Sequence, residues 1–180
     1  MPPVISLIGK SNSGKTTLLE KLIPQINSHG LRVGVLKHHT HEFTFDIPGK
    51  DTWRHKQAGA EIVVLATPDG IGLVKETKKE LSIEDIIRQY YQEVDIVITE
   101  GYKKGPYPKI EVCRADNNKR PLTGRDESWV AFAADLAIDT QLPVFDLNDF
   151  AGLASFIIAN FLTPPTTMNN QQGTKRITHA

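Results

Sequence analysis

Short apolar runs alternate along this chain with longer segments in which apolar residues recur every three or four positions. Continuous apolar runs of about four to eight residues are typical of buried strands, and the wider spacing is typical of helices with one buried face. This pattern predicts strands at residues 4–8, 31–36, 94–99, 109–113, 129–134 and 143–145. It predicts helices at residues 15–28, 51–58, 83–91 and 149–161. Because strands and helices alternate, we expect an α/β fold, with a mostly parallel twisted sheet and helices on both of its faces.

Two local features interrupt this alternation. The apolar runs 61–66 and 71–75 are separated by Thr67-Pro68-Asp69-Gly70, a turn sequence that predicts a β-hairpin excursion from the sheet. Pro24 lies within the first predicted helix, inside its apolar stripe. Because proline lacks an N–H and its ring crowds the preceding turn, we expect Pro24 to kink this helix or to loosen its hydrogen bonding.

The composition narrows the class of protein. A chain of 180 residues is long enough for one α/β domain, which we expect to comprise residues 1–162. Residues 163–180 have almost no apolar content and are predicted to be a disordered polar tail. The 21 basic and 21 acidic residues cancel, so we expect no broad electrostatic surface for nucleic acid.

The chain shows no sign of membrane insertion or secretion. No run approaches the roughly 20 apolar residues that cross a bilayer, and the first residues lack a signal-peptide pattern. The only cysteine, Cys113, cannot form an intramolecular disulfide and is predicted to be a buried small apolar residue. We therefore expect a cytoplasmic protein.

A phosphate-binding loop is predicted between the first strand and the first helix. Its residues are Gly9, Lys10, Ser11, Asn12, Ser13, Gly14, Lys15 and Thr16, and Thr17 follows. In such a loop the glycines let backbone N–H groups approach a triphosphate, while the positive end of the helix faces the anion. Lys15 would contact the β- and γ-phosphates as the catalytic lysine, and the Thr16 hydroxyl would bind Mg²⁺. The expected fold is thus similar to that of the P-loop NTPases.

Acidic residues near this loop are candidates for the metal and for catalysis. Glu100 directly follows the strand at 94–99, where it could bind Mg²⁺ through water or act as a base. Asp46 and Asp51 follow the second strand, and either could approach the metal or remain a surface acid. Asp95 lies at the opposite end of its strand and is expected to be solvated or to cap a neighbouring segment.

The segment Lys37-His38-His39-Thr40-His41 has several possible functions. Its imidazoles could bind an anionic partner molecule, could be solvated, or could ligate a metal ion, since alternate residues of an extended chain share a face. The loop at 100–109, which contains the sequence Lys-Lys-Gly-Pro, is placed to contact a substrate or a partner. Lys10 resembles the signature lysine of deviant P-loops, which crosses a dimer interface, but a solvated lysine is the alternative.

Several segments together resemble one family, the molybdopterin-guanine dinucleotide biosynthesis protein B family. They are "GKSNSGKTTLLEKLIP", "VGVLKHHTHEFTFDIPGKDTWRHKQAGA", "DIVITEGYKKGPYPKIEVCR", "AFAAD" and "VFDLNDFAGLASFI". The resemblance covers residues 4–162 and implies an α/β P-loop fold, an intertwined homodimer, GTP with Mg²⁺, and at most slow GTP hydrolysis. It implies a protein that assists the guanylyltransferase joining GMP to molybdopterin, and that could contact the molybdopterin itself.

The resemblance also assigns roles to individual residues. It implies that residues 9–17 hold phosphates, that Glu100 lies near Mg²⁺, and that the segment from His38 to Asp51, with His41, faces the nucleotide or the pterin. Asp135, at the end of "AFAAD", is the candidate for guanine recognition, because the usual Asn-Lys-x-Asp sequence is missing.

Three alternatives remain from the residues themselves. A small-molecule kinase would use the same loop, although Arg114, Arg120 and Arg125 do not form a clustered lid sequence. A metal-insertion GTPase would use the histidine segment to carry its metal. A non-catalytic adaptor would use the P-loop only to stabilise its fold.

Overall fold

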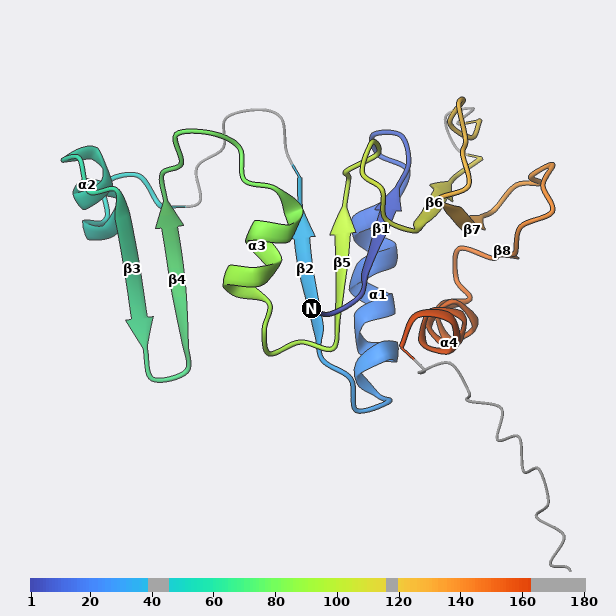
Figure 1. Ribbon diagram of the computed structural model, residues 1–180, viewed down its shortest axis with the longest axis horizontal. Helices are drawn as coiled ribbons and strands as arrows, with labels where there is room; N and C mark the ends of the chain where they lie inside the picture. The colour runs from blue at the N-terminus through green and yellow to red at the C-terminus, as the bar shows by residue number, and fades with distance from the viewer. Residues whose placement is uncertain (39–45, 116–119, 163–180) are drawn as a thin grey trace, which may run out of the picture.

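The computed structural model describes residues 1–38, 46–115 and 120–162. Among these residues, six parallel strands form one sheet in the order β2-β5-β1-β6-β7-β8 (Figure 1). The strands are β1 (Val4–Ile8), β2 (Val33–Lys37), β5 (Ile96–Glu100), β6 (Lys109–Cys113), β7 (Trp129–Ala134) and β8 (Val144–Phe145). The helices are α1 (Lys15–Asn27), α2 (Asp51–Gln57), α3 (Ile83–Tyr90) and α4 (Phe150–Phe161). The expected α/β fold is confirmed.

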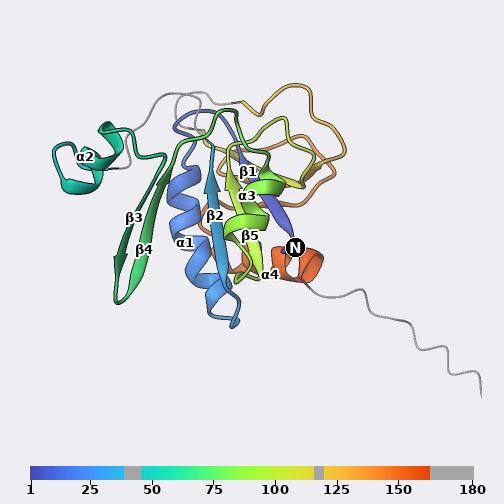
Figure 2. The ribbon, with the colours of Figure 1, turned by 60° about the vertical axis from the view of Figure 1, so that its left-hand side comes forward.

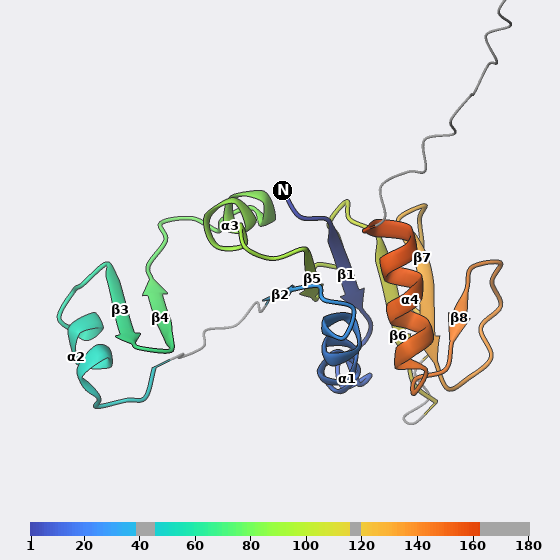
Figure 3. The same cartoon turned by 90° about the horizontal axis from the view of Figure 1, so that it is seen from below.

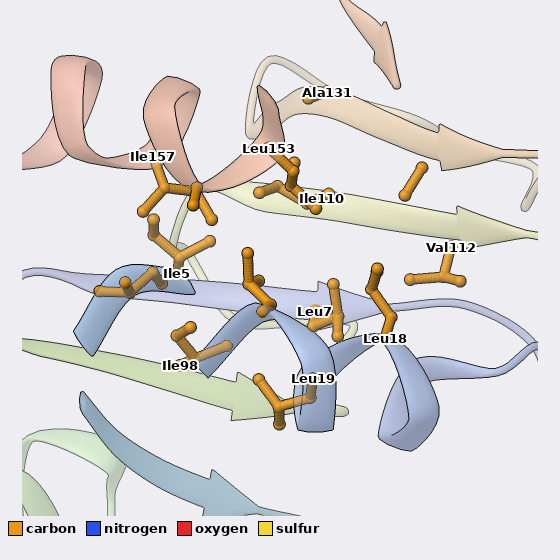
Figure 4. Packing of buried hydrophobic residues seen from close by; sticks show 14 of the residues in the cluster. Ile5, Leu7, Leu18, Leu19, Ile98, Ile110, Val112, Ala131, Leu153 and Ile157 are labelled. Carbon is orange, nitrogen blue, oxygen red and sulfur yellow. The ribbon is translucent and has the colours of Figure 1, made fainter. Parts of the chain in front are cut away.

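The sheet is covered on both faces, which explains why its central strands are continuously apolar. Helices α1 and α4 pack together on one face, over side chains such as Ile5, Ile98 and Ile110 (Figure 4). Helix α3 lies on the opposite face, where its Ile87 packs with Val97 (Figure 3). The central strands β1, β5 and β6 are accordingly buried along their whole length.

Cys113 belongs to a second cluster, together with Ile8, Trp129 and Phe132. Its side chain is buried, as the sequence predicts. Burial and the nearby Glu111 carboxylate raise the pKa of the Cys113 thiol to about 12. Because the thiol therefore stays protonated at neutral pH, Cys113 acts as a core residue there and not as a nucleophile.

Helix α1 continues through Pro24 instead of ending there. Its buried face consists of Leu18, Leu19, Leu22 and Ile26, which pack against the sheet and α4. Proline removes one helical donor, but the carbonyl of Pro24 still accepts from the Ser28 N–H at 3.0 Å. Burial of the apolar stripe thus holds the helix together despite the proline.

The hairpin forms a small separate lobe with α2. Strands β3 (Ile62–Thr67) and β4 (Gly70–Lys75) pair in antiparallel fashion, and α2 packs against β3. The lobe projects from the edge of the molecule beyond β2 (Figures 1 and 2). Its apolar side chains include several that are strongly exposed, namely Ile62, Val64, Leu65, Ile71 and Leu73.

Strands β2 and β5 each begin two residues later than the sequence predicts. Strand β2 starts at Val33 and β5 at Ile96, because Arg32 and Asp95 form an ion pair just before the two strands. The Asp95 carboxylate accepts hydrogen bonds from the Arg32 backbone N–H at 2.7 Å and from its guanidinium at 3.2 Å. These bonds hold the pKa of Asp95 below its usual range. Asp95 thus joins two segments, as a capping residue would.

None of the helices in the described part of the chain has both the length and the apolar character needed to cross a membrane. The tail at 163–180 lies outside the described residues, so its predicted disorder and the domain boundary at residue 162 stay predictions.

Candidate nucleotide-binding site

The loop between β1 and α1 has backbone angles that require glycine at two positions. Gly9 has φ of 149°, and a Cβ there would lie 2.6 Å from the carbonyl oxygen of Val112 on β6. Gly14 caps α1 with φ of 90°. Asn12 is also left-handed, with φ of 57°, a conformation that asparagine tolerates better than most residues. These angles fold the loop tightly over the start of α1.

Lys15 lies across this loop. Its Nζ is 2.8 Å from the carbonyl oxygen of Lys10 and 3.4 Å from that of Gly9. The lysine charge is thus held over the loop, at the end of α1 where the helix dipole is positive. An anion placed here would meet the ammonium group and the N–H groups of the first helical turn together.

Ser13 gives independent support for a ligand in the loop. Its side chain is 1% exposed, and within the described part of the chain its hydroxyl has no hydrogen-bond partner. A buried hydroxyl without a partner costs free energy. A phosphate oxygen is a suitable acceptor for it, so the loop fits the group that its sequence predicts.

Glu100 contacts Thr16 of the phosphate loop. It ends β5, next to β1, and its Oε1 accepts a hydrogen bond from the Thr16 hydroxyl at 2.9 Å. Lys37, at the end of β2, places its Nζ 3.3 Å from the same oxygen. The structure thus brings Thr16 and Glu100 together, as the sequence predicts. Both are oxygen donors of the kind that Mg²⁺ prefers.

The described residues contain no group of three or more His, Cys, Asp or Glu side chains that could hold a metal ion. A Mg²⁺ ion beside Thr16 and Glu100 would therefore take further ligands from phosphate oxygens and water. This is the usual arrangement for Mg²⁺ in nucleotide sites. His39 and His41 lie outside the described residues, so their roles stay predictions.

Asp46 contacts residues of the hairpin lobe. Its Oδ1 accepts from the Ile47 N–H and from the Thr52 hydroxyl, each at 2.9 Å. It borders a cavity of about 280 Å³ against hairpin residues such as Val63. Asp51 is exposed at the start of α2. The structure thus places the two acids in the hairpin lobe and does not bring Asp46 to Thr16.

His38 is brought to the phosphate loop. It lines a cavity of about 660 Å³ that Gly9, Ser11 and Lys15 also border, and that the turn after β5 completes. Its Nε2 is 3.0 Å from Oε1 of Glu80, and its ring lies 4.3 Å from that of Tyr102. Sequence reasoning missed these two partners, because nothing in their local sequence distinguishes them from ordinary loop residues.

The turn after β5 is held in an unusual conformation. Tyr102 has φ of 46°, a strained angle for a non-glycine residue, and Gly101 before it has φ of 112°. Further along, the buried Lys109 donates from Nζ to the Gly105 carbonyl at 2.7 Å. The turn also carries Lys103 and Lys104, which line the same cavity. The cavity beside the phosphate loop is therefore lined by three lysines, Lys15, Lys103 and Lys104, and by the acid Glu80.

Asp135 lies on the opposite side of the loop from Glu100, at the end of β7. Its Oδ1 accepts a hydrogen bond from the Ala115 N–H at 2.6 Å. Ala115 follows the end of β6, so the carboxylate joins the turns after two neighbouring strands. One of its oxygens is engaged in this way, and the carboxylate still has acceptor capacity for a ligand.

The fold and this loop define the class of the chain: it is an α/β protein with the sequence pattern of a phosphate-binding loop between its first strand and first helix. Within that class it belongs to a known family. Residues 4–135 match the model of the family described as molybdopterin guanine dinucleotide synthesis protein B. This match confirms the resemblance found in the sequence.

Similar proteins agree with this membership. A molybdopterin-guanine dinucleotide biosynthesis adapter protein of Haemophilus influenzae is 38% identical over 156 residues, covering 86% of this chain and 87% of that protein. The adapter protein of Escherichia coli with the same name is 33% identical over 162 residues, covering 88% and 93%. A crystal structure of molybdopterin-guanine biosynthesis protein B matches with a TM-score of 0.69 and 27% identity, covering 87% of this chain and 98% of that one.

Proposed function

We propose that this chain is a GTP-binding adapter protein in the biosynthesis of molybdopterin guanine dinucleotide, where it assists the guanylyltransferase. The observation that carries the proposal is the loop at residues 9–16, with Lys15 held across it and Thr16 hydrogen-bonded to Glu100. The names of the relatives supply the pathway. The single cysteine agrees with a cytoplasmic location.

Each site residue has a defined task in this proposal. Lys15 exchanges its contacts with loop carbonyls for the β- and γ-phosphates, and the Ser13 hydroxyl gains the acceptor that it lacks among the described residues. Thr16 and Glu100 hold Mg²⁺, which neutralises phosphate charge when bound. Hydrolysis is slow at most, because a Glu100 carboxylate that holds Mg²⁺ and pairs with Lys37 is not free to act as a base.

The cavity beside the phosphate loop is where a bound nucleotide could affect the segments that face the guanylyltransferase. His38 and Lys15 border the same cavity, so a γ-phosphate there would contact the segment after β2 and the turn at 101–105 together. We infer that GTP sets the conformation of these two segments, which then face the guanylyltransferase or the pterin of molybdopterin. Lys103 and Lys104 suit the anionic phosphate of such a partner molecule.

The hairpin lobe supports a homodimer. Because β3 and β4 pair Val64 with Leu73 and Ala66 with Ile71, these side chains share one face. Ile71 is 76% exposed and Val64 50%. An exposed apolar face of this kind on a two-stranded lobe is costly in water, and a second copy of the chain would cover it. In such a dimer Lys10 could approach the nucleotide of the partner, as the resemblance implies.

Replacement of Lys15 tests the nucleotide site separately from the fold. The substitution Lys15→Ala should weaken Mg²⁺-GTP binding at least about 100-fold, because it removes the ammonium group from the terminal phosphates. Binding is measured by isothermal titration calorimetry, and the oligomeric state by sedimentation. Lys21→Ala, on the exposed side of α1, is the matched control. Loss of the folded dimer in Lys15→Ala would contradict this separation of roles.

A further inference from the structure

Arg114 lies against the phosphate loop. It follows the end of β6, and its side chain is half-buried. A Cβ built on Gly14 would lie 3.5 Å from Cζ, 3.5 Å from Nη2 and 3.7 Å from Nε of Arg114. Because three guanidinium atoms are at nearly equal distances from this point, one flat side of the guanidinium packs on Gly14.

The guanidinium of Arg114 lies at the N-terminal end of α1. It packs beside Gly14, the N-cap residue, where the end of the helix has positive character. Within residues 1–38, 46–115 and 120–162, no carboxylate forms an ion pair with Arg114. By contrast, Glu100 on the other side of the loop is paired with Lys37.

The strand order decides which part of the nucleotide Arg114 faces. In the order β5-β1-β6-β7, Glu100 lies on one side of the phosphate loop, and Arg114 and Asp135 lie on the other. In the proposed function Thr16 and Glu100 hold the metal, so the terminal phosphates would lie on the Glu100 side. The β6–β7 side is therefore left for the nucleoside half. The bond from the Ala115 N–H to Asp135 fixes the turn that directly follows Arg114.

We propose that Arg114 is a positioning residue for the nucleoside half of the bound nucleotide, with its guanidinium plane stacked on the purine base. A planar guanidinium stacks on aromatic rings, which a lysine ammonium cannot do. Stacking does not depend on the identity of the purine, so Arg114 adds affinity and leaves base choice to other groups. This inference rests on the proposed function, because it requires a nucleotide in the phosphate loop.

The test compares GTP, ATP and inorganic tripolyphosphate, each with Mg²⁺, by isothermal titration calorimetry on the full chain. Arg114→Ala should weaken GTP and ATP by the same factor, about 3- to 30-fold, and should leave tripolyphosphate unchanged. Arg114→Lys should behave like the alanine variant, because it keeps the charge and loses the plane. Arg88→Ala, on α3, is the matched control and should bind all three like the unaltered protein.

The outcomes separate this inference from the proposed function. If the unaltered chain does not bind GTP, the proposed function itself fails. If it binds GTP and Arg114→Ala binds equally well, the role of Arg114 is overturned. An equal loss for tripolyphosphate would also overturn it, because Arg114 would then act on phosphates. Thermal unfolding of each variant shows whether the domain is intact, and Arg114→Lys serves if the alanine variant does not fold.

Discussion

Thr16 and Glu100 are 84 residues apart in the sequence, yet their side chains are joined by a hydrogen bond of 2.9 Å. This contact links the phosphate loop to the strand end that carries the acid. Asp135 and Arg114 occupy the other side of the same loop. At the scale of single residues, the proposed function therefore gives the site a metal side and a nucleoside side, and substitutions on each side should affect different properties of nucleotide binding.

Replacement of Asp135 tests the nucleoside side of the site, because it should change the preference for guanine. Its carboxylate can accept from the N1 and N2 donors of guanine, whereas an amide would donate to the carbonyl that xanthine has in place of the guanine amino group. Asp135→Asn should therefore lower GTP affinity at least about tenfold and favour XTP over GTP. Its remaining side-chain oxygen can still accept from the Ala115 N–H. Competition of XTP and GTP against a labelled nucleotide measures this change.

Asp139→Asn, in the same turn, is the control for this substitution, because Asp139 is exposed and lies four positions further along the chain. Unchanged preference for GTP in Asp135→Asn would show that another group recognises guanine.

At the scale of elements, the strands, the helices and the loop between β1 and α1 could be predicted because their signals are local, although β2 and β5 begin two residues later than expected. The loop spacing from Gly9 to Thr16 specifies a strand, a turn and a helix, and Glu100 follows an apolar run. The contacts between His38, Glu80 and Tyr102 could not be predicted, because they depend on which turns meet above the sheet.

The same limit explains Asp46 and Arg114. Asp46 follows β2 in the sequence, so proximity to the metal was a reasonable expectation, but the chain continues into the hairpin lobe instead. Arg114 has no distinctive local sequence, and its place beside Gly14 depends on the adjacency of β1 and β6. Sequence patterns thus define elements better than they define how the turns between them converge.

Gly34 shows how closely β2 packs against the segment after α3. A Cβ at this position would lie 2.4 Å from Cδ1 of Tyr91, whose hydroxyl donates to the Val35 carbonyl at 2.6 Å. Gly34→Ala should therefore overpack this contact and lower the free energy of unfolding by about 1–3 kcal/mol. Urea denaturation measures the change. Gly72→Ala, in a strand with no heavy atom within 4 Å of the new Cβ, is the matched control.

A Gly34→Ala variant as stable as the unaltered protein would mean that Tyr91 moves away freely, and that the hydrogen bond to Val35 does not hold its ring in place.

At the scale of the whole molecule, the hairpin lobe is the part whose exposed apolar side chains are hardest to explain in a monomer. Its α2 and two strands project from a domain whose six-stranded sheet is otherwise well covered (Figure 1). The exposed face around Ile71 has an apolar character that we assign to the homodimer. In the proposed function, the lobe serves assembly and the phosphate loop serves nucleotide binding.

A charged residue introduced on the hairpin lobe tests whether the lobe forms the dimer interface. Ile71→Glu should raise the dissociation constant of the dimer at least about tenfold, because the carboxylate would have to be buried in an apolar contact. Analytical ultracentrifugation over a range of concentrations measures the effect, and Lys21→Glu on α1 is the control. The unfolding temperature of the monomer should change little, since the side chain is 76% exposed. A dimer of unchanged strength in Ile71→Glu would place the interface elsewhere.

The most direct test of the proposed function is a titration of the purified chain with fluorescently labelled GTP and ATP, with and without Mg²⁺, and with Lys15→Ala as the control. The proposal predicts that GTP binds better than ATP, and that Mg²⁺ strengthens GTP binding through Thr16 and Glu100. It also predicts that Lys15→Ala weakens GTP binding at least about 100-fold. Equal or better binding of ATP would contradict the assignment of GTP, and binding that survives Lys15→Ala would contradict the phosphate loop as the site.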